Sequence, residues 1–239
     1  MDRGNGNDKY DKEKIDRWNK IHIGIGSREE VRKQYDGWLE LNNRIQKIVQ
    51  GCKTPIIDLG CGSGNNTLHL TENGKQVIAC DFSPIALEKI RTNIPEATTR
   101  EFNMEQGLPF SKDSTELVVA DLSLHYFSNE KTSFILDEIR RMLAPGGHLV
   151  FRVNSVNDKN FGAGQGIEIE PNFYEVRETT KRFFDEPSLR HFLPEDKWDF
   201  IHLKEEEMPE ENIRTLWQDG KTVGSAKRKT LWTCAVRKK

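Results

Sequence analysis

The chain has 239 residues, with a hydrophobic fraction of 35% and a charged fraction of 31%. This length favours one α/β domain with additions over two full-sized domains. No apolar run approaches the roughly 18 residues that span a bilayer, so we expect a soluble protein without a membrane partner. The 36 basic and 38 acidic residues leave a net charge of −2. Such a balance gives no overall field to hold a polyanion and disfavours nucleic acid as a partner.

We expect no export signal at the beginning of the chain. Residues 1–14 are rich in Asp, Asn, Gly and Lys and lack the apolar segment of a secretory leader. We expect a disordered tail here. The four cysteines form neither a Cys-x-x-Cys pair nor a zinc-ligand spacing with histidine. Together these features predict a cytoplasmic protein with reduced thiols and no bound metal.

Apolar residues recur at helical spacing over residues 15–50 and predict helices that cover part of a ligand cleft. Strand-like and helix-like runs then alternate, which is typical of βαβ units and a mainly parallel sheet. The expected strands are 56–59, 76–80, 98–102, 117–121, 148–153, 198–203 and 230–236, and the expected helices include 84–93 and 133–143. We predict that the last two strands pair antiparallel. The predicted fold class is a Rossmann-like, doubly wound α/β sheet of about seven strands, mostly parallel with an antiparallel C-terminal strand.

Periodicity weakens between the fifth and sixth expected strands. A glycine-rich stretch, residues 161–169, precedes the run Lys181-Arg182-Phe183-Phe184. Within a domain spanning 51–239, we interpret residues 155–195 as an insertion that acts as a lid over the cleft. A solvated loop with a buried phenylalanine pair is the alternative.

A glycine turn follows the first expected strand and opens a helix. The sequence Asp58-Leu59-Gly60-Cys61-Gly62-Ser63-Gly64 allows the backbone to turn sharply and to approach a ligand closely. A dinucleotide fingerprint would have its third glycine at position 65, where the residue is Asn65. This spacing disfavours NAD. Asp81, at the end of the second expected strand, suits the ribose of any nucleoside cofactor.

The joint pattern resembles the class I S-adenosylmethionine-dependent methyltransferases. It consists of the glycine turn, Asp81, Asn103-Met104, Asp121 and the run from Leu143 to Gly147, and it extends over about 55–153. The C-terminal run from Trp232 to Lys239 adds a weaker similarity to methyltransferases of the tellurite-resistance TehB type. The resemblance implies an enzyme with S-adenosyl-L-methionine as its cofactor.

The resemblance also implies which residues hold that cofactor. In the family, the glycine turn borders the methionine part, the acidic residue after the second strand holds the ribose, and residues after the third strand flank the adenine. Carried over, the cofactor residues are Asp58, Gly60, Cys61, Gly62, Gly64, Asn65, Asp81, Phe82, Asn103, Met104 and Asp121. Asn103 departs from the aspartate that is common at its position, although an amide oxygen also accepts a hydrogen bond.

Four residues are candidates for the acceptor side. Methyl transfer from a sulfonium mainly requires alignment, so a base is not obligatory. We predict catalytic positions at His125, as a base or polar wall, and at Arg152, as a partner for an anionic acceptor. Tyr174 and Arg182 are predicted to reach the acceptor from the lid. The alternatives are a packing role for His125 and a structural carboxylate partner for Arg152.

The stretch after the fourth strand, from Asp121 to Tyr126, lacks the Asn/Asp-Pro-Pro-Tyr/Phe motif of many amino methyltransferases. We therefore expect an enzyme acting on a small molecule, such as a thiol, a chalcogen oxyanion or another metabolite, with no nucleic-acid partner. An RNA or protein methyltransferase and a noncatalytic S-adenosylmethionine-binding module are the alternatives. The oligomeric state is left open.

Overall fold

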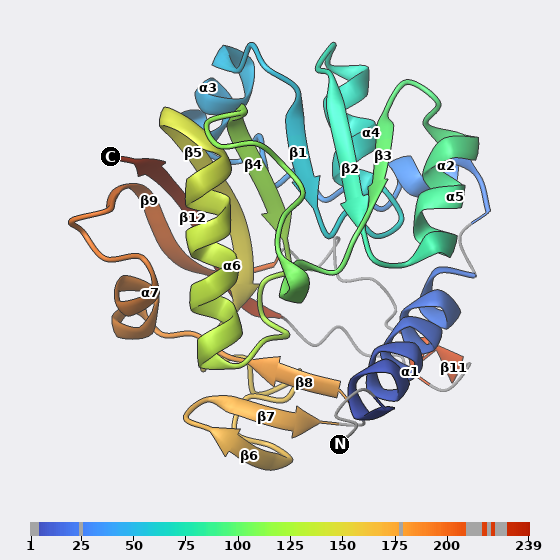
Figure 1. The fold of residues 1–239 in the computed structure, drawn as a ribbon, viewed down its shortest axis with the longest axis vertical. Coiled ribbons are helices and arrows are strands. Elements are labelled where there is room, and N and C mark those ends of the chain that lie inside the picture. The colour runs from blue at the N-terminus through green and yellow to red at the C-terminus, as the bar shows by residue number, and fades with distance from the viewer. Residues whose placement is uncertain (1–4, 24–25, 177–178, 209–216, 219–220, 223–228) are drawn as a thin grey trace.

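A seven-stranded sheet forms the centre of the molecule in the computed structural model, with the strand order β3-β2-β1-β4-β5-β12-β9 (Figure 1). The model describes residues 5–23, 26–176, 179–208, 217–218, 221–222 and 229–239. The strands are β1 (Ile56–Leu59), β2 (Val77–Asp81), β3 (Thr98–Glu101), β4 (Thr115–Asp121), β5 (Leu143–Asn154), β9 (Trp198–Glu207) and β12 (Thr230–Lys238). Strands β1 to β5 pair in parallel, whereas β12 is antiparallel to both β5 and β9. The predicted fold class is confirmed.

Helices cover both faces of this sheet. The main ones are α3 (Asn43–Gly51), α4 (Asn65–Glu72), α5 (Pro84–Asn93) and α6 (Asn129–Met142), and shorter ones are α2 (Arg28–Arg32), α7 (Glu186–Phe192) and the 3₁₀ helix η1 (Met104–Gln106). Successive residues of β4 alternate between the two faces. Val118 packs in the same core as Ile135 of α6, and Val119 packs with Ile45 of α3. Burial on both faces explains the nearly continuous apolar strands.

Helix α1 (Asn5–His22) lies across the carboxyl ends of the central strands (Figure 1). It begins inside the segment expected to be a disordered tail, and that expectation is wrong for residues 5–14. The polar composition of the segment gave no apolar stripe to indicate a helix. The last turn of α1 is nevertheless anchored, because Ser83 Oγ donates to Asn19 Oδ1 at 2.6 Å and Lys89 Nζ donates to the carbonyl oxygen of Ile23 at 2.9 Å.

A second, three-stranded antiparallel sheet lies below the carboxyl ends of the main sheet (Figure 1). Its strands are β6 (Ile167–Glu170), β7 (Phe173–Val176) and β8 (Thr179–Arg182). Part of the expected glycine-rich loop is therefore strand. Gly166 permits this, because a Cβ there would lie 2.1 Å from the carbonyl oxygen of Glu175 on the paired strand. Strands β10 (Trp217–Gln218) and β11 (Lys221–Thr222) form a separate antiparallel pair.

No helix among the described residues is long and apolar enough to cross a bilayer.

Candidate active site

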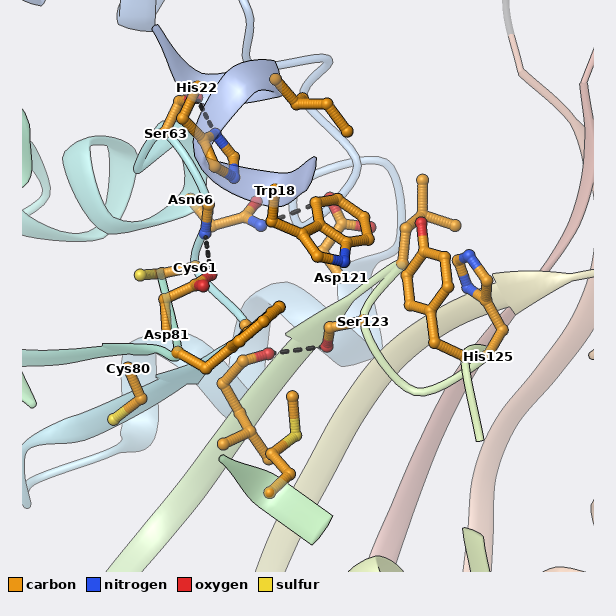
Figure 2. A pocket seen from close by; sticks show the side chains of 18 of the residues that line it. Trp18, His22, Cys61, Ser63, Asn66, Cys80, Asp81, Asp121, Ser123 and His125 are labelled. Carbon is orange, nitrogen blue, oxygen red and sulfur yellow. Dashed lines mark hydrogen bonds between the residues drawn. The ribbon is translucent and has the colours of Figure 1, made fainter. Parts of the chain in front are cut away.

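A cavity of about 680 Å³ opens at the carboxyl ends of the central strands, where ligands bind in open α/β sheets. Its size is that of a small-molecule or cofactor site, for which about 300–1,000 Å³ is usual. Residues from the strand ends form its floor. Trp18 and His22 of α1 lie across the cavity from Asp81 and Ser123 (Figure 2).

The glycine turn presents bare backbone to this cavity. Gly60 has φ +75°, and a Cβ on it would lie 2.4 Å from Cβ of Ser123. Ser123 is held in place because its hydroxyl donates to the carbonyl oxygen of Leu59 at 2.6 Å. Gly62 has φ +52°, and a Cβ on it would lie 3.2 Å from the ring of His22. Only glycine combines this backbone conformation with so close an approach.

Asp81 is fixed between the glycine turn and the start of α5. One carboxylate oxygen accepts from the backbone N–H of Gly62 at 2.9 Å, and the other accepts from that of Ser83 at 2.9 Å. The side chain lines the cavity with 9% of its surface exposed. Each carboxylate oxygen can accept more than one hydrogen bond, so Asp81 can still receive hydroxyl groups of a ligand.

Helix α1 closes the cavity through aromatic contacts. The centroid of the Trp18 ring lies 5.0 Å from that of Tyr126 and 6.4 Å from that of Phe82. His22 Nδ1 is 3.1 Å from Ser63 Oγ (Figure 2). Burial lowers the pKa of His22, which keeps its ring neutral at pH 7. Trp18 and His22 therefore place two uncharged rings opposite the glycine turn.

Arg152 is paired with two carboxylates. Its Nε and one terminal nitrogen donate to the two oxygens of Asp121 at 2.7 and 2.9 Å, and its other terminal nitrogen donates to Asp36 at 2.6 Å. Burial raises the pKa of Asp121, but the charge of Arg152 outweighs it and the net pKa is lowered. Arg152 lines the cavity, yet each of its three nitrogens already donates to a carboxylate. This geometry does not support the prediction that Arg152 binds an anionic acceptor. It supports the alternative, in which Arg152 pairs with a structural carboxylate.

His125 and Asn154 form a polar wall at the other end of the cavity. Each side chain is 2% exposed. His125 Nδ1 and Asn154 Oδ1 have no hydrogen-bond partner in the described part of the chain. Burial, together with the charges of Lys229 and Lys181, holds the pKa of His125 well below its usual range. The ring is therefore neutral, with one nitrogen able to accept a hydrogen bond.

Two lysines that the sequence did not single out as site residues also line this end. Lys181 comes from β8, and Lys229 immediately precedes β12. The ammonium of Lys229 lies 5.9 Å from the centroid of the Phe161 ring. Burial lowers its pKa to about 8, and burial likewise raises that of nearby Asp158 to about 6. Lys181 belongs to the run Lys181-Arg182-Phe183-Phe184 described above. For Lys229, the one signal in the sequence was its position just before an expected strand.

Tyr174 and Arg182 do not line the cavity, so the geometry gives their predicted catalytic roles no support. Neighbouring residues of a strand point to opposite faces, and β8 directs Lys181 inward and Arg182 away. The Arg182 guanidinium donates to the carbonyl oxygen of Phe127 at 3.1 Å and lies 4.8 Å from the centre of the Phe173 ring. Arg182 therefore ties the small sheet to the main one.

Most residues of the expected cofactor set line the cavity. They are Gly60, Cys61, Gly62, Asn65, Asp81, Phe82, Asn103, Met104 and Asp121. Asp58 and Gly64 lie behind the lining. Asp58 accepts from Thr67 Oγ1 at 2.5 Å, and burial raises its pKa to about 7. Gly64 has φ +89° and leaves space for Ile94, because a Cβ on Gly64 would lie 2.8 Å from Cδ1 of Ile94. Both residues shape the turn from behind.

Residues 57–151 match the methyltransferase domain family. This match covers less than half of the chain, and it confirms the resemblance of this stretch to the class I S-adenosylmethionine-dependent methyltransferases. The chain is 33% identical over 153 residues to tRNA N(3)-methylcytidine methyltransferase Mettl2 of Drosophila melanogaster, covering 58% of this chain and 46% of that protein. It is 33% identical over 125 residues to demethylmenaquinone methyltransferase of Lactococcus lactis, covering 49% and 48%. The chain thus spans about half the length of these curated relatives.

The fold is shared with TehB of Haemophilus influenzae, with a TM-score of 0.57 and 16% identity over 87% of this chain and 67% of that one. The TehB-type layout anticipated from the compact chain is therefore present as a fold.

The tRNA methyltransferase among the relatives overturns one expectation. A small-molecule acceptor with no nucleic-acid partner was predicted from the net charge and from the missing Asn/Asp-Pro-Pro-Tyr/Phe motif, and this prediction is wrong. Net charge averages over the whole chain, whereas binding depends on where charges lie. Here Lys14, Lys181 and Lys229 all line one cavity.

The residues present fit S-adenosylmethionine, the cofactor of this family. Gly60 forms a cradle that a Cβ would fill, and Asp81 stands fixed beside it. All four cysteines are free thiols. Among the described residues, no three histidine, cysteine or acidic side chains gather as a metal site.

Proposed function

We propose that this protein transfers a methyl group from S-adenosylmethionine to a nucleobase of RNA. The observation that carries the proposal is that one cavity has two distinct ends. The glycine turn and Asp81 form the first end, and the neutral pair His125 and Asn154 forms the second. A noncatalytic cofactor-binding module would need only the first.

The first end holds the cofactor in this proposal. When bound, S-adenosylmethionine supplies a methyl group on a positively charged sulfur. The backbone of Gly60 and Gly62 borders its methionine part, Asp81 receives the ribose hydroxyls, and Asn103 and Met104 flank the adenine. Trp18, packed on Phe82, shields the site from water.

Local chemistry favours RNA as the acceptor. Flipped or single-stranded bases are bound by aromatic side chains and by hydrogen bonds to their edges. Phe161 and Tyr126 supply aromatic surface to the cavity, and Lys181 and Lys229 supply positive charge to it. The tRNA methyltransferase among the relatives supports the same class. The demethylmenaquinone methyltransferase shows that a shared domain alone does not determine the acceptor.

The test is transfer of a labelled methyl group from S-adenosylmethionine to unmodified tRNA transcripts, followed by digestion to nucleosides. We expect label in one methylated nucleoside. The matched control is Gly60→Val, which fills the cradle and should abolish transfer. A protein that binds S-adenosylhomocysteine but labels no RNA would contradict the RNA acceptor and leave the cofactor assignment intact.

A further inference from the structure

Two lysines of the cavity come from different sheets. Lys181 belongs to β8 of the small sheet, and Lys229 immediately precedes β12 of the main sheet. Both line the cavity, as does His125, and the charge of each lysine lowers the pKa of His125. The charge of Lys181 also lowers the pKa of Lys229. Because such effects fall off with distance, the two ammonium groups share one end of the cavity.

Backbone hydrogen bonds hold both lysines in place. The N–H of Met208, just after β9, donates to the carbonyl oxygen of Lys229 at 2.9 Å. The N–H of Arg182, next to Lys181, donates to the carbonyl oxygen of His125 at 2.7 Å. The ammonium of Lys229 lies 5.9 Å from the centroid of the Phe161 ring, which also lines the cavity. The two charges are therefore attached to anchored parts of the fold.

Lys229 differs from other cations of the cavity in its partners. Lys14 pairs with Glu105, and Arg152 pairs with two carboxylates. Lys229 is half-buried and forms no ion pair in the part of the chain that the structure describes. Lysine is rarely buried without such a partner, because removing its charge from water is costly. A cation of this kind in a cavity indicates that a ligand supplies the negative charge.

The local charge balance is positive by about one. Asp158 is a carboxylate near the two lysines, and its pKa of about 6 leaves it mostly ionised at pH 7. The charges of Lys229 and Lys181 both lower that pKa. Asp121 and Arg152 also act on Lys229, but with opposite signs, and they are paired with each other. Two ammonium groups and one carboxylate thus match one phosphodiester, which carries a single negative charge.

We propose that Lys181 and Lys229 bind a backbone phosphate of the acceptor RNA inside the cavity. This inference rests on the proposed function and concerns the phosphate beside the acceptor base, whichever base that is. An ammonium binds phosphate as a point charge with three donors, so it tolerates several orientations of the backbone. Free phosphate shares this chemistry, and the experiment separates the two sources.

The first measurement is the affinity of unmodified tRNA transcripts for the full chain saturated with S-adenosylhomocysteine, between about 50 and 200 mM KCl. In the double variant Lys181→Met/Lys229→Met, binding should weaken. The slope of log affinity against log salt should become shallower by about one, as for one lost phosphate contact. Lys229→Arg keeps the charge and should keep the slope. Lys53→Met, the matched control, removes an exposed lysine just before β1, at the opposite edge of the sheet, and should also keep it.

The second measurement uses the wild type and does not depend on the folding of a variant. An amine-acylating reagent labels lysines, and peptide mass spectrometry reads the extent of labelling at each one. Bound transcripts should protect Lys181 and Lys229 from acylation and leave Lys53 unprotected. Inorganic phosphate is the probe for the second source, and potassium chloride at the same ionic strength is its control.

The outcomes separate the phosphate subsite from the proposed function. An unchanged salt slope in a double variant that still binds S-adenosylhomocysteine overturns the subsite. Labelling of Lys181 and Lys229 that the transcripts do not reduce also overturns it, and protection by inorganic phosphate alone assigns the two lysines to a free phosphate instead. Methyl transfer to the same transcripts without protection leaves the proposed function intact, whereas absence of transfer by a wild type that binds S-adenosylhomocysteine contradicts the RNA acceptor.

Discussion

Arg152 clamps Asp121 with two hydrogen bonds, of 2.7 and 2.9 Å, at the junction of β4 and β5. The same guanidinium donates to Asp36, which precedes α3, and lies 4.6 Å from the centre of the Trp38 ring. Trp38 in turn donates to Asn66 of α4 at 2.8 Å. This network joins the segment before the sheet to the strand ends under the cavity.

Removing the cation of this network should destabilise the fold. In Arg152→Met, two buried carboxylates lose their partner, and we expect a loss of about 3–5 kcal/mol in the free energy of unfolding. Chemical denaturation measures it. Arg237→Met, which breaks a pair with Asp199 at the surface, should cost less than about 1 kcal/mol. Equal losses in the two variants would show that Arg152 is not a structural ion partner.

The cradle at Gly60 can be tested with a matched glycine. Gly60 and Gly74 have almost the same φ, +75° and +76°, but a Cβ on Gly74 meets nothing within 4 Å. Gly74→Ala should cost about 1–2 kcal/mol of stability from backbone strain alone and leave S-adenosylhomocysteine binding unchanged. Gly60→Ala adds the clash with Ser123 and should cost more and weaken that binding. Similar calorimetric affinities for both variants would argue against a cradle at Gly60.

The role of Asp81 is tested by its removal. Asp81→Ala should weaken S-adenosylhomocysteine binding by about 1–3 kcal/mol, the usual cost of unmade hydrogen bonds to a buried polar group. Because Asp81 also accepts from Gly62 and Ser83, thermal unfolding of the variant must be measured alongside. Asp199→Ala, at the surface, is the control. Unchanged affinity for S-adenosylhomocysteine in a folded Asp81→Ala variant would show that Asp81 does not bind the ribose.

Lys229 predicts a pH dependence. Its pKa of about 8 in the folded protein, against 10.5 ordinarily, means that the ammonium is lost as the pH rises through about 8. Binding of unmodified tRNA transcripts should therefore weaken across that range, and in Lys229→Met this step should vanish. Stability changes with the opposite sign: between the two pKa values the unfolded chain binds the proton and the folded one does not, so wild-type stability rises relative to Lys229→Met. A step at the same pH in both proteins would assign it to another group.

Local sequence was enough to predict that the glycine turn and Asp81 meet at the strand ends, where they line the cavity. The turn from Gly60 to Gly64 and the aspartate at position 81 depend on strand ends and short-range backbone geometry. Both can be predicted from the spacing of residues along the sequence. The alternating apolar runs predicted the sheet. The strand-like run over residues 230–236 predicted its antiparallel last strand.

The acceptor end could not be predicted in the same way. Whether Lys181 or Arg182 faces the cavity depends on the register of β8 against its neighbours, and a shift of one residue exchanges them. Lys229 reaches the site only because β12 returns to pair with β5. Helix α1 was missed as far as residue 14 because its stability comes from docking and not from its own polar sequence.

The central claim is tested most directly by calorimetric titration of the protein with S-adenosylhomocysteine and, separately, with NAD. The glycine spacing and the fixed carboxylate of Asp81 predict binding of S-adenosylhomocysteine at one site per chain and no binding of NAD. Binding of NAD alone, or of neither ligand, would contradict it.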